Sequence, residues 1–209
     1  MNMLEIGRLL RAGITGCVVG CRVTQISVPV FGGMVCIPLE DGSQVFGIIT
    51  DIHIDDDGLV CKLVTHENVS EDVILDNRVN RNVPVEISVL FCGYEQARQI
   101  SHLLPPRPPL TLDAMYLCAP KEMARFLSAG RFGYLRHILR SVDLPVGELL
   151  AAHLQQAGAV MAEAGKPEWL PAAMQELITL LRDDYPTLMG VLGALSDIHL
   201  PETMTGGAQ

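Results

Sequence analysis

The 209 residues carry a formal net charge of −9, and 49% of them are apolar although only 5% are aromatic. No stretch approaches the roughly 18–20 consecutive apolar residues that cross a bilayer, so the composition argues against a membrane span. The opening MNMLEIGRLLRAG contains Glu5 and no sustained apolar core, which predicts no signal peptide and a soluble, cytoplasmic protein. The acidic balance also disfavours a broad surface for direct binding of nucleic acid.

Short apolar runs separated by turn residues predict a β-structure over residues 1–104. Asp41-Gly42 lies between two apolar runs, as in a β-hairpin, and Asp55–Gly58 is predicted to turn the chain into a further strand, LVCKLV. NVSEDVILDNRVNRN is expected to hold a short helix that Ser70 caps. Alternation in VPVEISVLFCGY places four apolar residues on one face: Val85, Ile87, Val89 and Phe91. This pattern favours a small, closed or nearly closed β-barrel.

The segment PPRPPL marks the end of the barrel pattern. Its four prolines predict a stiff, extended connector over residues 105–120. The alternative is a ligand for a domain that recognises polyproline helices.

Helical spacing of apolar residues then predicts a helical region over residues 121–200, followed by a flexible tail over 201–209. Pro120 suits a first helical turn, Pro145 ends the second helix, and Gly165-Lys166-Pro167 ends the third. In PEWLPAAMQELITLLRDD the spacing predicts one buried face: Met174, Leu177, Ile178 and Leu181. The fold class expected is therefore α+β, with a β-barrel before a helical region.

The acidic segment after the second apolar run is the best metal candidate: Asp51, His53, Asp55, Asp56 and Asp57. A calcium loop needs ligands at alternate positions across about twelve residues and closes with a bidentate Glu, but here Glu67 follows an apolar predicted strand, so a polar turn is preferred. Gly165-Lys166 does not form a phosphate loop, because Val160 replaces the first glycine and Pro167 the final hydroxyl residue. The sequence predicts no catalytic residue, no cofactor and no metal.

The six cysteines contain no CxxC pair. Cys17 and Cys21 share a face of a predicted strand but are about 13 Å apart, too far to hold one ion. The cysteines are therefore interpreted as buried, reduced thiols that behave as small hydrophobic residues. The six histidines are scattered and are assigned packing or surface roles: His53, His66, His102, His137, His153 and His199.

One local excess of positive charge runs from Lys121 to Arg140, opposed by Glu122 alone. Its arginines form a candidate partner-binding basic face: Arg125, Arg131, Arg136 and Arg140. The alternative is that they are ordinary solvated residues on helix surfaces.

The N-terminal half carries Ile6-Gly7-Arg8, the apolar strand Cys17–Gly20, and a hairpin whose arms are Gly33–Ile37 and Val45–Ile52. These features resemble the HAS-barrel, the six-stranded barrel shared by HerA-type DNA-translocating ATPases and the ATP synthase rotor-ring subunits. The strand Val85–Tyr94 followed by PPRPP and Tyr116-Leu117 resembles the exit from the HerA barrel. Phe132–Leu135 and Leu144–Val146 continue the resemblance more weakly.

In the HerA family an ATPase core with a phosphate loop follows soon after the position of Val146, whereas here helices follow. The resemblance therefore implies the barrel's role in subunit contacts and in docking a nuclease, without ATP hydrolysis. We expect a non-catalytic assembly or adaptor module that forms a homo-oligomer or docks to a HerA-type ATPase or nuclease as a DNA-repair accessory. The alternatives are a nucleic-acid accessory protein that uses the basic face, and a metal-dependent enzyme built on the Asp51–Asp57 segment.

Overall fold

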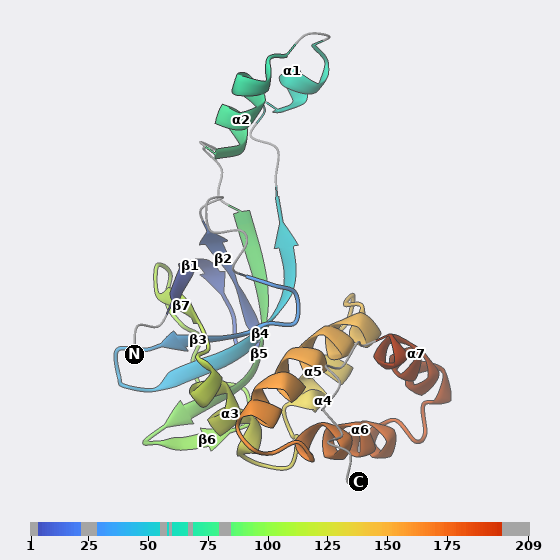
Figure 1. Ribbon diagram of the computed structural model, residues 1–209. Coiled ribbons are helices and arrows are strands. Elements are labelled where there is room, and N and C mark those ends of the chain that lie inside the picture. Colours follow the sequence, from blue (N-terminus) through green and yellow to red (C-terminus); the bar gives the residue numbers. More distant parts are fainter. Residues whose placement is uncertain are drawn as a thin grey trace, which may run out of the picture. The chain divides into compact units, whose positions relative to one another are not determined.

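The computed structural model describes residues 4–21, 29–54, 58, 60–66, 69–79 and 85–197 (Figure 1). The chain divides into two compact units, Met1–Cys118 and Ala119–Gln209. The first is an antiparallel β-barrel and the second is helical, which confirms the predicted α+β class. Among the described helices, none combines the length and the apolar character that a membrane crossing requires.

Seven strands make up the sheet of the first unit. They are β1 (Leu4–Ala12), β2 (Gly16–Cys21), β3 (Met34–Pro38), β4 (Gln44–His53), β5 (Val85–Gln96), β6 (Gln99–Ser101) and β7 (Ala114–Leu117). Their order is β2-β1-β7-β3-β4-β5-β6, and a further pairing of β2 with β5 closes six of them into a barrel. β6 stays outside this ring and forms a hairpin with the end of β5. The expected six-stranded barrel is therefore present.

Two tight hairpins show how local sequence sets the register. In β3–β4 the turn contains Gly42 at φ +79°, and the Asp41 carboxylate accepts a hydrogen bond from the Ser43 amide at 2.9 Å, as predicted for a DG hairpin. In β5–β6 the two turn residues, Ala97 and Arg98, both have positive φ, at 50° and 65°. Such a turn usually uses Asn-Gly, so two residues with side chains are strained there.

The barrel closes where β2 meets β5, and Gly16 is required at that point. A Cβ on Gly16 would overlap the carbonyl oxygen of Val89, because the two backbones approach closely. Register shifts between β4 and β5, at Phe46/Gly47 and Ile49/Asp51, mark bulges that increase the curvature of the sheet.

The barrel interior is filled almost entirely by aliphatic and sulfur-containing side chains, as the low aromatic content predicts, and Phe91 is the only aromatic residue in this cluster. Its members are Ile6, Leu9, Cys17, Val19, Cys21, Val35, Ile37, Val45, Ile49, Val85, Ile87, Val89, Phe91 and Met115. β3 and β4 also bury residues that alternate with the interior ones, such as Cys36, Phe46 and Ile48. These strands are therefore buried on both faces, whereas β1 exposes most of its outer residues.

Two segments differ from the sequence prediction. LVCKLV is predicted as a strand, but residues 60–64 form a short helix, α1 (Val60–Val64). Because β4 pairs directly with β5, the segment between them has no neighbouring strand in the described sheet. The range 105–120, expected to be a connector, contains strand β7, which pairs with β1 and β3. The helix expected around Ser70 is present as α2 (Glu71–Val79).

The second unit is organised around one long helix. Its helices are α3 (Pro120–Ser128), α4 (Leu135–Leu139), α5 (Val146–Glu163), α6 (Trp169–Leu180) and α7 (Tyr185–Ser196). α5 packs against each of the other four. A Cβ on Gly147 of α5 would lie 3.3 Å from the carbonyl oxygen of Gly190 in α7, so this helix crossing is close.

The buried face of α6 is rotated from the predicted one. Trp169, Ala173 and Leu177 are buried at intervals of four residues, and the indole of Trp169 donates a hydrogen bond to the carbonyl oxygen of Leu127 at 3.2 Å. Leu177 and Leu181 are buried as predicted, but Ile178 is 38% exposed, so its assignment to the core was wrong. Ile178 lies about 100° around the helix from Leu177, beyond the stripe that Trp169 fixes.

Candidate functional site

Of the five residues predicted as metal candidates, the structure describes Asp51 and His53. Asp51 and His53 lie near the end of β4 with exposed side chains, and the Asp51 carboxylate accepts a hydrogen bond from the adjacent Ile52 amide. Asp55, Asp56 and Asp57 lie outside the described residues. No cluster of three metal-ligating side chains in the described residues includes Asp51 or His53.

The four arginines of the candidate basic face occupy α3, α4 and the turn that joins them. Arg125 lies in the last turn of α3, Arg131 in the turn, Arg136 on α4 and Arg140 at its C-cap. Arg136 is half-buried, whereas the other three are exposed. Whether these side chains act together stays a prediction.

His153, assigned a packing role from sequence, lies in the core of the helical unit. Its Nε2 atom is 3.1 Å from the Tyr134 hydroxyl, and both side chains are fully buried. The two rings meet edge to face, and Phe126 packs edge-on against Tyr134 in the same way. This pair satisfies two polar groups inside an apolar core, so it accounts for His153 structurally.

The proline-rich segment forms the wall of a groove in the barrel unit. The groove has a volume of about 240 Å³ and lies between residues 105–110, Tyr94 and the Asp41 turn. Pro105 and Pro109 are buried, whereas Pro106 and Pro108 are exposed. Each pair of prolines three residues apart therefore has one buried member, so the segment does not present the PxxP face that a polyproline reader binds.

The Asp41 carboxylate at the rim of this groove is held ionised by its surroundings. The Ser43 hydroxyl and then the Ser43 amide donate hydrogen bonds to it, and the more distant Arg107 charge adds to their effect, so the pKa of Asp41 is lowered. Both hydrogen bonds reach the Oδ1 atom of Asp41 and lie within its own turn, so this residue stabilises the hairpin.

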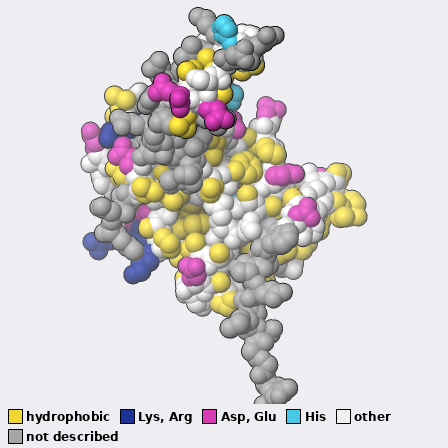
Figure 2. All heavy atoms as spheres, turned by 45° about the horizontal axis from the view of Figure 1, so that its top comes forward, with side chains coloured by type: hydrophobic (Ala, Val, Ile, Leu, Met, Phe, Trp, Pro, Cys, Tyr) yellow, Lys and Arg dark blue, Asp and Glu magenta, His cyan; other side chains and the backbone are white. Residues whose placement is uncertain are grey.

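The insertion between β4 and β5 exposes apolar residues. All six side chains from Glu71 to Asp76 of α2 are exposed, and they include Ile74 at 38% and Leu75 at 63%. Val73 and Val64 are also exposed, the latter at 79%. Glu71, Asp72 and Asp76 flank the apolar run, and Figure 2 shows hydrophobic and acidic side chains side by side at the upper end of its view. We call Val64, Val73, Ile74 and Leu75 the insertion surface.

The six side chains described in this nine-residue helix, those of residues 71–76, are all exposed, so they bury little apolar surface against the rest of the chain. Isolated helices shorter than about 12–15 residues are marginal in water, and most helices in proteins depend on packing of an apolar face. Adjacent exposed aliphatic residues of this kind mark surfaces where proteins associate. The sequence predicted the helix but not its exposure, because the run Val73-Ile74-Leu75 would serve equally well in a core.

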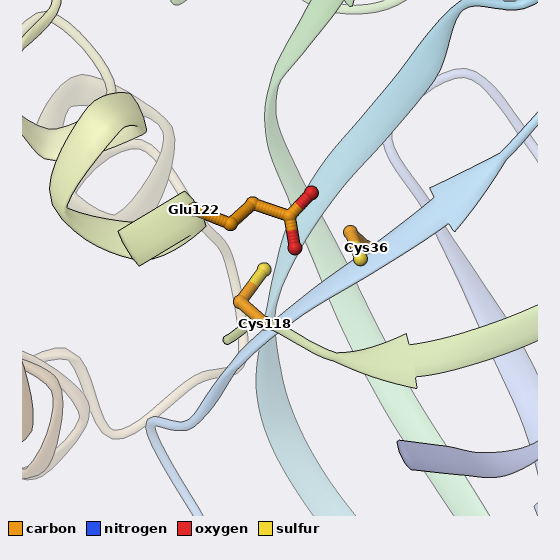
Figure 3. A group of neighbouring side chains, drawn as sticks. All are labelled: Cys36, Cys118 and Glu122. Atoms are coloured by element: carbon orange, nitrogen blue, oxygen red, sulfur yellow. The ribbon is translucent and has the colours of Figure 1, made fainter. Parts of the chain in front are cut away.

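Two cysteine thiols that are far apart in the sequence lie close together in the barrel unit. Cys36 on β3 and Cys118, which follows β7, have Sγ atoms within 4.8 Å of each other (Figure 3). Neither forms a disulfide, and both are buried. Glu122, the third residue labelled there, belongs to α3 of the second unit. The pairing of β3 with β7 brings the two cysteines together across 82 positions of sequence, and no local spacing signals it.

The other described cysteines have the inert character predicted for them. Burial raises the pKa of Cys17 to about 12, and burial also raises the pKa of Cys92. Burial also raises the pKa of Cys21. These three thiols are therefore protonated at neutral pH and unreactive.

Comparison with known proteins adds no relative to this picture. No protein-family model matches the chain, and no curated protein matches it either.

Proposed function

We propose that this chain is a non-catalytic adaptor that docks to another protein through the insertion surface on α1 and α2. The observation that carries the proposal is the exposure of Ile74 and Leu75 on a helix too short to be stable alone. A partner that covers this helix would bury its aliphatic side chains and stabilise its backbone at the same time.

The closed barrel supports docking through side chains rather than through strand addition. In an open sheet, edge strands offer rows of unpaired backbone groups to another chain. Here the pairing of β2 with β5 joins the two sides of the described sheet, and the terminal strand β6 spans only Gln99–Ser101. Three residues give little backbone for pairing, so the barrel serves as a rigid support for the insertion.

The resemblance to the HAS-barrel suggests the class of partner: a HerA-type ATPase or its associated nuclease in DNA processing. The closed six-stranded barrel is the fold that this resemblance predicts. The five cysteines whose side chains the structure describes form no disulfide, which suits a reducing compartment such as the cytoplasm. Self-association into a homo-oligomer is the alternative outcome for the same surface.

The experiment is co-expression of the chain with a HerA-type ATPase from the same genome, followed by light scattering on the purified material. The expected result is a complex containing both chains, which Ile74→Asp combined with Leu75→Asp abolishes. The matched control is Leu103→Asp, because Leu103 is similarly exposed, at 58%, but lies outside the insertion. A monomer that binds neither the ATPase, the nuclease nor a second copy at high concentration contradicts the proposal.

A further inference from the structure

The groove that residues 105–110 line lies at the other end of β4 from the insertion. β4 begins at Gln44, between the lining residues Ser43 and Val45, and its other end, His53, leads into the insertion. A strand of 10 residues rises about 3.3 Å per residue, so the two ends of β4 are about 30 Å apart. Every lining residue of the groove belongs to the barrel unit. The groove is therefore a site separate from the insertion surface and complete within one unit.

The floor of the groove is apolar and preformed. Val45, Pro105 and Pro109 are buried, and the half-buried Tyr94 lines the same groove. Because proline fixes φ at about −65°, the wall formed by residues 105–110 loses little conformational entropy when a ligand binds. The volume of about 240 Å³ is below the roughly 300–1,000 Å³ of pockets for drug-sized ligands. The groove therefore suits a few side chains of an extended peptide better than a small molecule.

Polar side chains around this floor are open to a ligand. Glu40, Tyr94 and Gln96 line the groove and have no hydrogen-bond or ion-pair partner within the described ranges of the chain. Tyrosine presents an aromatic face with a hydroxyl at its end, a combination that is enriched at protein interfaces. A hydroxyl and a side-chain amide can both bind the N–H and C=O groups of an extended peptide. The groove thus combines an apolar floor with a few open polar groups, as binding sites do.

The charges around the groove favour a cationic ligand. Three carboxylates line it, those of Glu40, Asp41 and Asp113, against the one guanidinium of Arg107. Hydrogen bonds within the barrel unit orient two of them: Asp41 accepts from its own turn, and Asp113 accepts from the Leu110 amide at 2.8 Å. Glu40 is exposed and has no such bond in the described residues, so its carboxylate is the one open to a cation. The excess of negative charge repels phosphates and disfavours nucleic acid.

We propose that this groove binds an extended peptide segment of a partner protein in which an arginine or lysine lies next to apolar residues. The cationic side chain pairs with Glu40, and an arginine can do so through two parallel hydrogen bonds. The apolar neighbours pack against Tyr94 and the buried prolines, while Gln96 and the Tyr94 hydroxyl bind the peptide backbone. Proline-rich segments suit such a groove because they are extended before they bind. This contact is additional to docking through the insertion surface and does not depend on it.

The test is selection of random dodecapeptides displayed on phage against the full chain, followed by fluorescence anisotropy with the best peptide. We expect the selected peptides to share an arginine or lysine beside proline or other apolar residues. Glu40→Gln should weaken binding about threefold to fivefold, the range for an exposed ion pair. Replacing the basic residue of the peptide by a neutral residue of similar shape should weaken it equally. Selected peptides without a basic residue, or equal binding by the Glu40→Gln variant, overturn the proposal.

Two controls separate this groove from other surfaces. Glu163→Gln removes the same charge from an exposed position at the end of α5 and should bind the peptide as the wild type does. The double variant Ile74→Asp with Leu75→Asp should also bind normally, so loss of the adaptor contact and loss of this one are distinguishable.

A further measurement needs no variant. In ¹H–¹⁵N NMR spectra of the wild type, the amides of Glu40, Tyr94 and Gln96 should shift most when the peptide is added. Shifts confined to α2 would place the peptide on the insertion surface and exclude the groove.

Discussion

The barrel wall, meaning the strands that form the barrel, and the insertion between β4 and β5 differ in how far their aliphatic side chains are buried. Ile49, in the wall, is 0% exposed and belongs to the interior cluster, whereas Ile74, in α2, is 38% exposed. Both residues come from similar β-branched runs in the sequence. β4 and β5 hydrogen-bond directly to each other, and the segment that joins them contains α1 and α2, where Val64, Val73, Ile74 and Leu75 are exposed. The barrel wall therefore contributes the stability of a packed core, whereas the insertion contributes an exposed apolar surface.

Truncation of the two isoleucines tests this comparison most strongly. Ile49→Ala should lower the free energy of unfolding of the barrel by about 3–4 kcal/mol, because it leaves a cavity in a packed core. Ile74→Ala should change it by less than about 0.5 kcal/mol, as substitutions on an exposed surface do. Hydrogen exchange read on peptides from β4 and β5 isolates the barrel, whereas fluorescence of the single Trp169 reports the helical unit. Equal losses for both variants would show that α2 is part of the barrel core.

Substitutions of Gly13 and Gly16 in the β1–β2 hairpin test how the barrel closes between β2 and β5. Gly16→Ala should destabilise the barrel by about 2–3 kcal/mol, because its Cβ would overlap the Val89 carbonyl oxygen and force β2 away from β5. Gly13→Ala is the control, since its Cβ would meet no atom closer than the Gly16 carbonyl oxygen at 4.0 Å. Faster hydrogen exchange at β2 and β5 in the first variant alone is the expected readout. Similar exchange in both variants would mean that closure tolerates a wider gap.

Alkaline pH weakens the wall through its buried thiols. Burial raises the pKa of Cys17 from 9.0 to about 12, so the folded state keeps this thiol protonated after the unfolded chain has begun to lose its proton. Stability is therefore independent of this group below pH 9 and falls between pH 9 and about 12, by about 1.4 kcal/mol for each pH unit. Urea unfolding of wild type and Cys17→Ala from pH 7 to 11 should show a smaller decline in the variant. A parallel decline would assign it to other groups.

A double substitution in the β5–β6 turn is expected to have the smallest effect on stability, and this effect is an increase. Replacing Ala97 by Asn and Arg98 by Gly should stabilise the barrel by about 0.5–1 kcal/mol, because both positions have positive φ and the new residues adopt it with less strain. Differential scanning calorimetry of the double variant against wild type would record a higher melting temperature. A lower one would mean that these side chains make contacts that outweigh the strain.

The sequence predicted the elements whose signals are local. The DG hairpin, the alternating face of β5 and the five helices of the second unit all follow from residue types at short spacing. α1 was missed because Val60–Val64 is too short for its period to distinguish helix from strand. Ile178 was misplaced because the spacing of four apolar residues did not show that Trp169 sets the buried stripe of α6.

The candidate sites were harder to predict from the sequence. Each depends on whether residues that are far apart in the sequence come into contact in the fold. The neighbourhood of Cys36 and Cys118 exists only because Ala114–Leu117 pairs with β3, and the prolines just before that strand suggested a connector instead. The insertion surface consists of ordinary core residue types, and their exposure is visible only in the fold. In the acidic run, Asp51 and His53 join no cluster of metal-ligating side chains among the described residues, and Asp55, Asp56 and Asp57 lie outside those residues.

The first and last strands of the barrel, β1 and β7, are hydrogen-bonded neighbours, with Leu4 opposite Leu117. In the barrel unit taken without the helical unit, a short linker could therefore join these two ends, and opening the chain at the insertion would give a circular permutant of the barrel with the same strand order. In such a permutant α1 and α2 would become the two terminal segments, which could be removed or exchanged one at a time. The closed barrel is thus separate from the insertion between β4 and β5. Other binding segments could replace this insertion without changing the register of any strand.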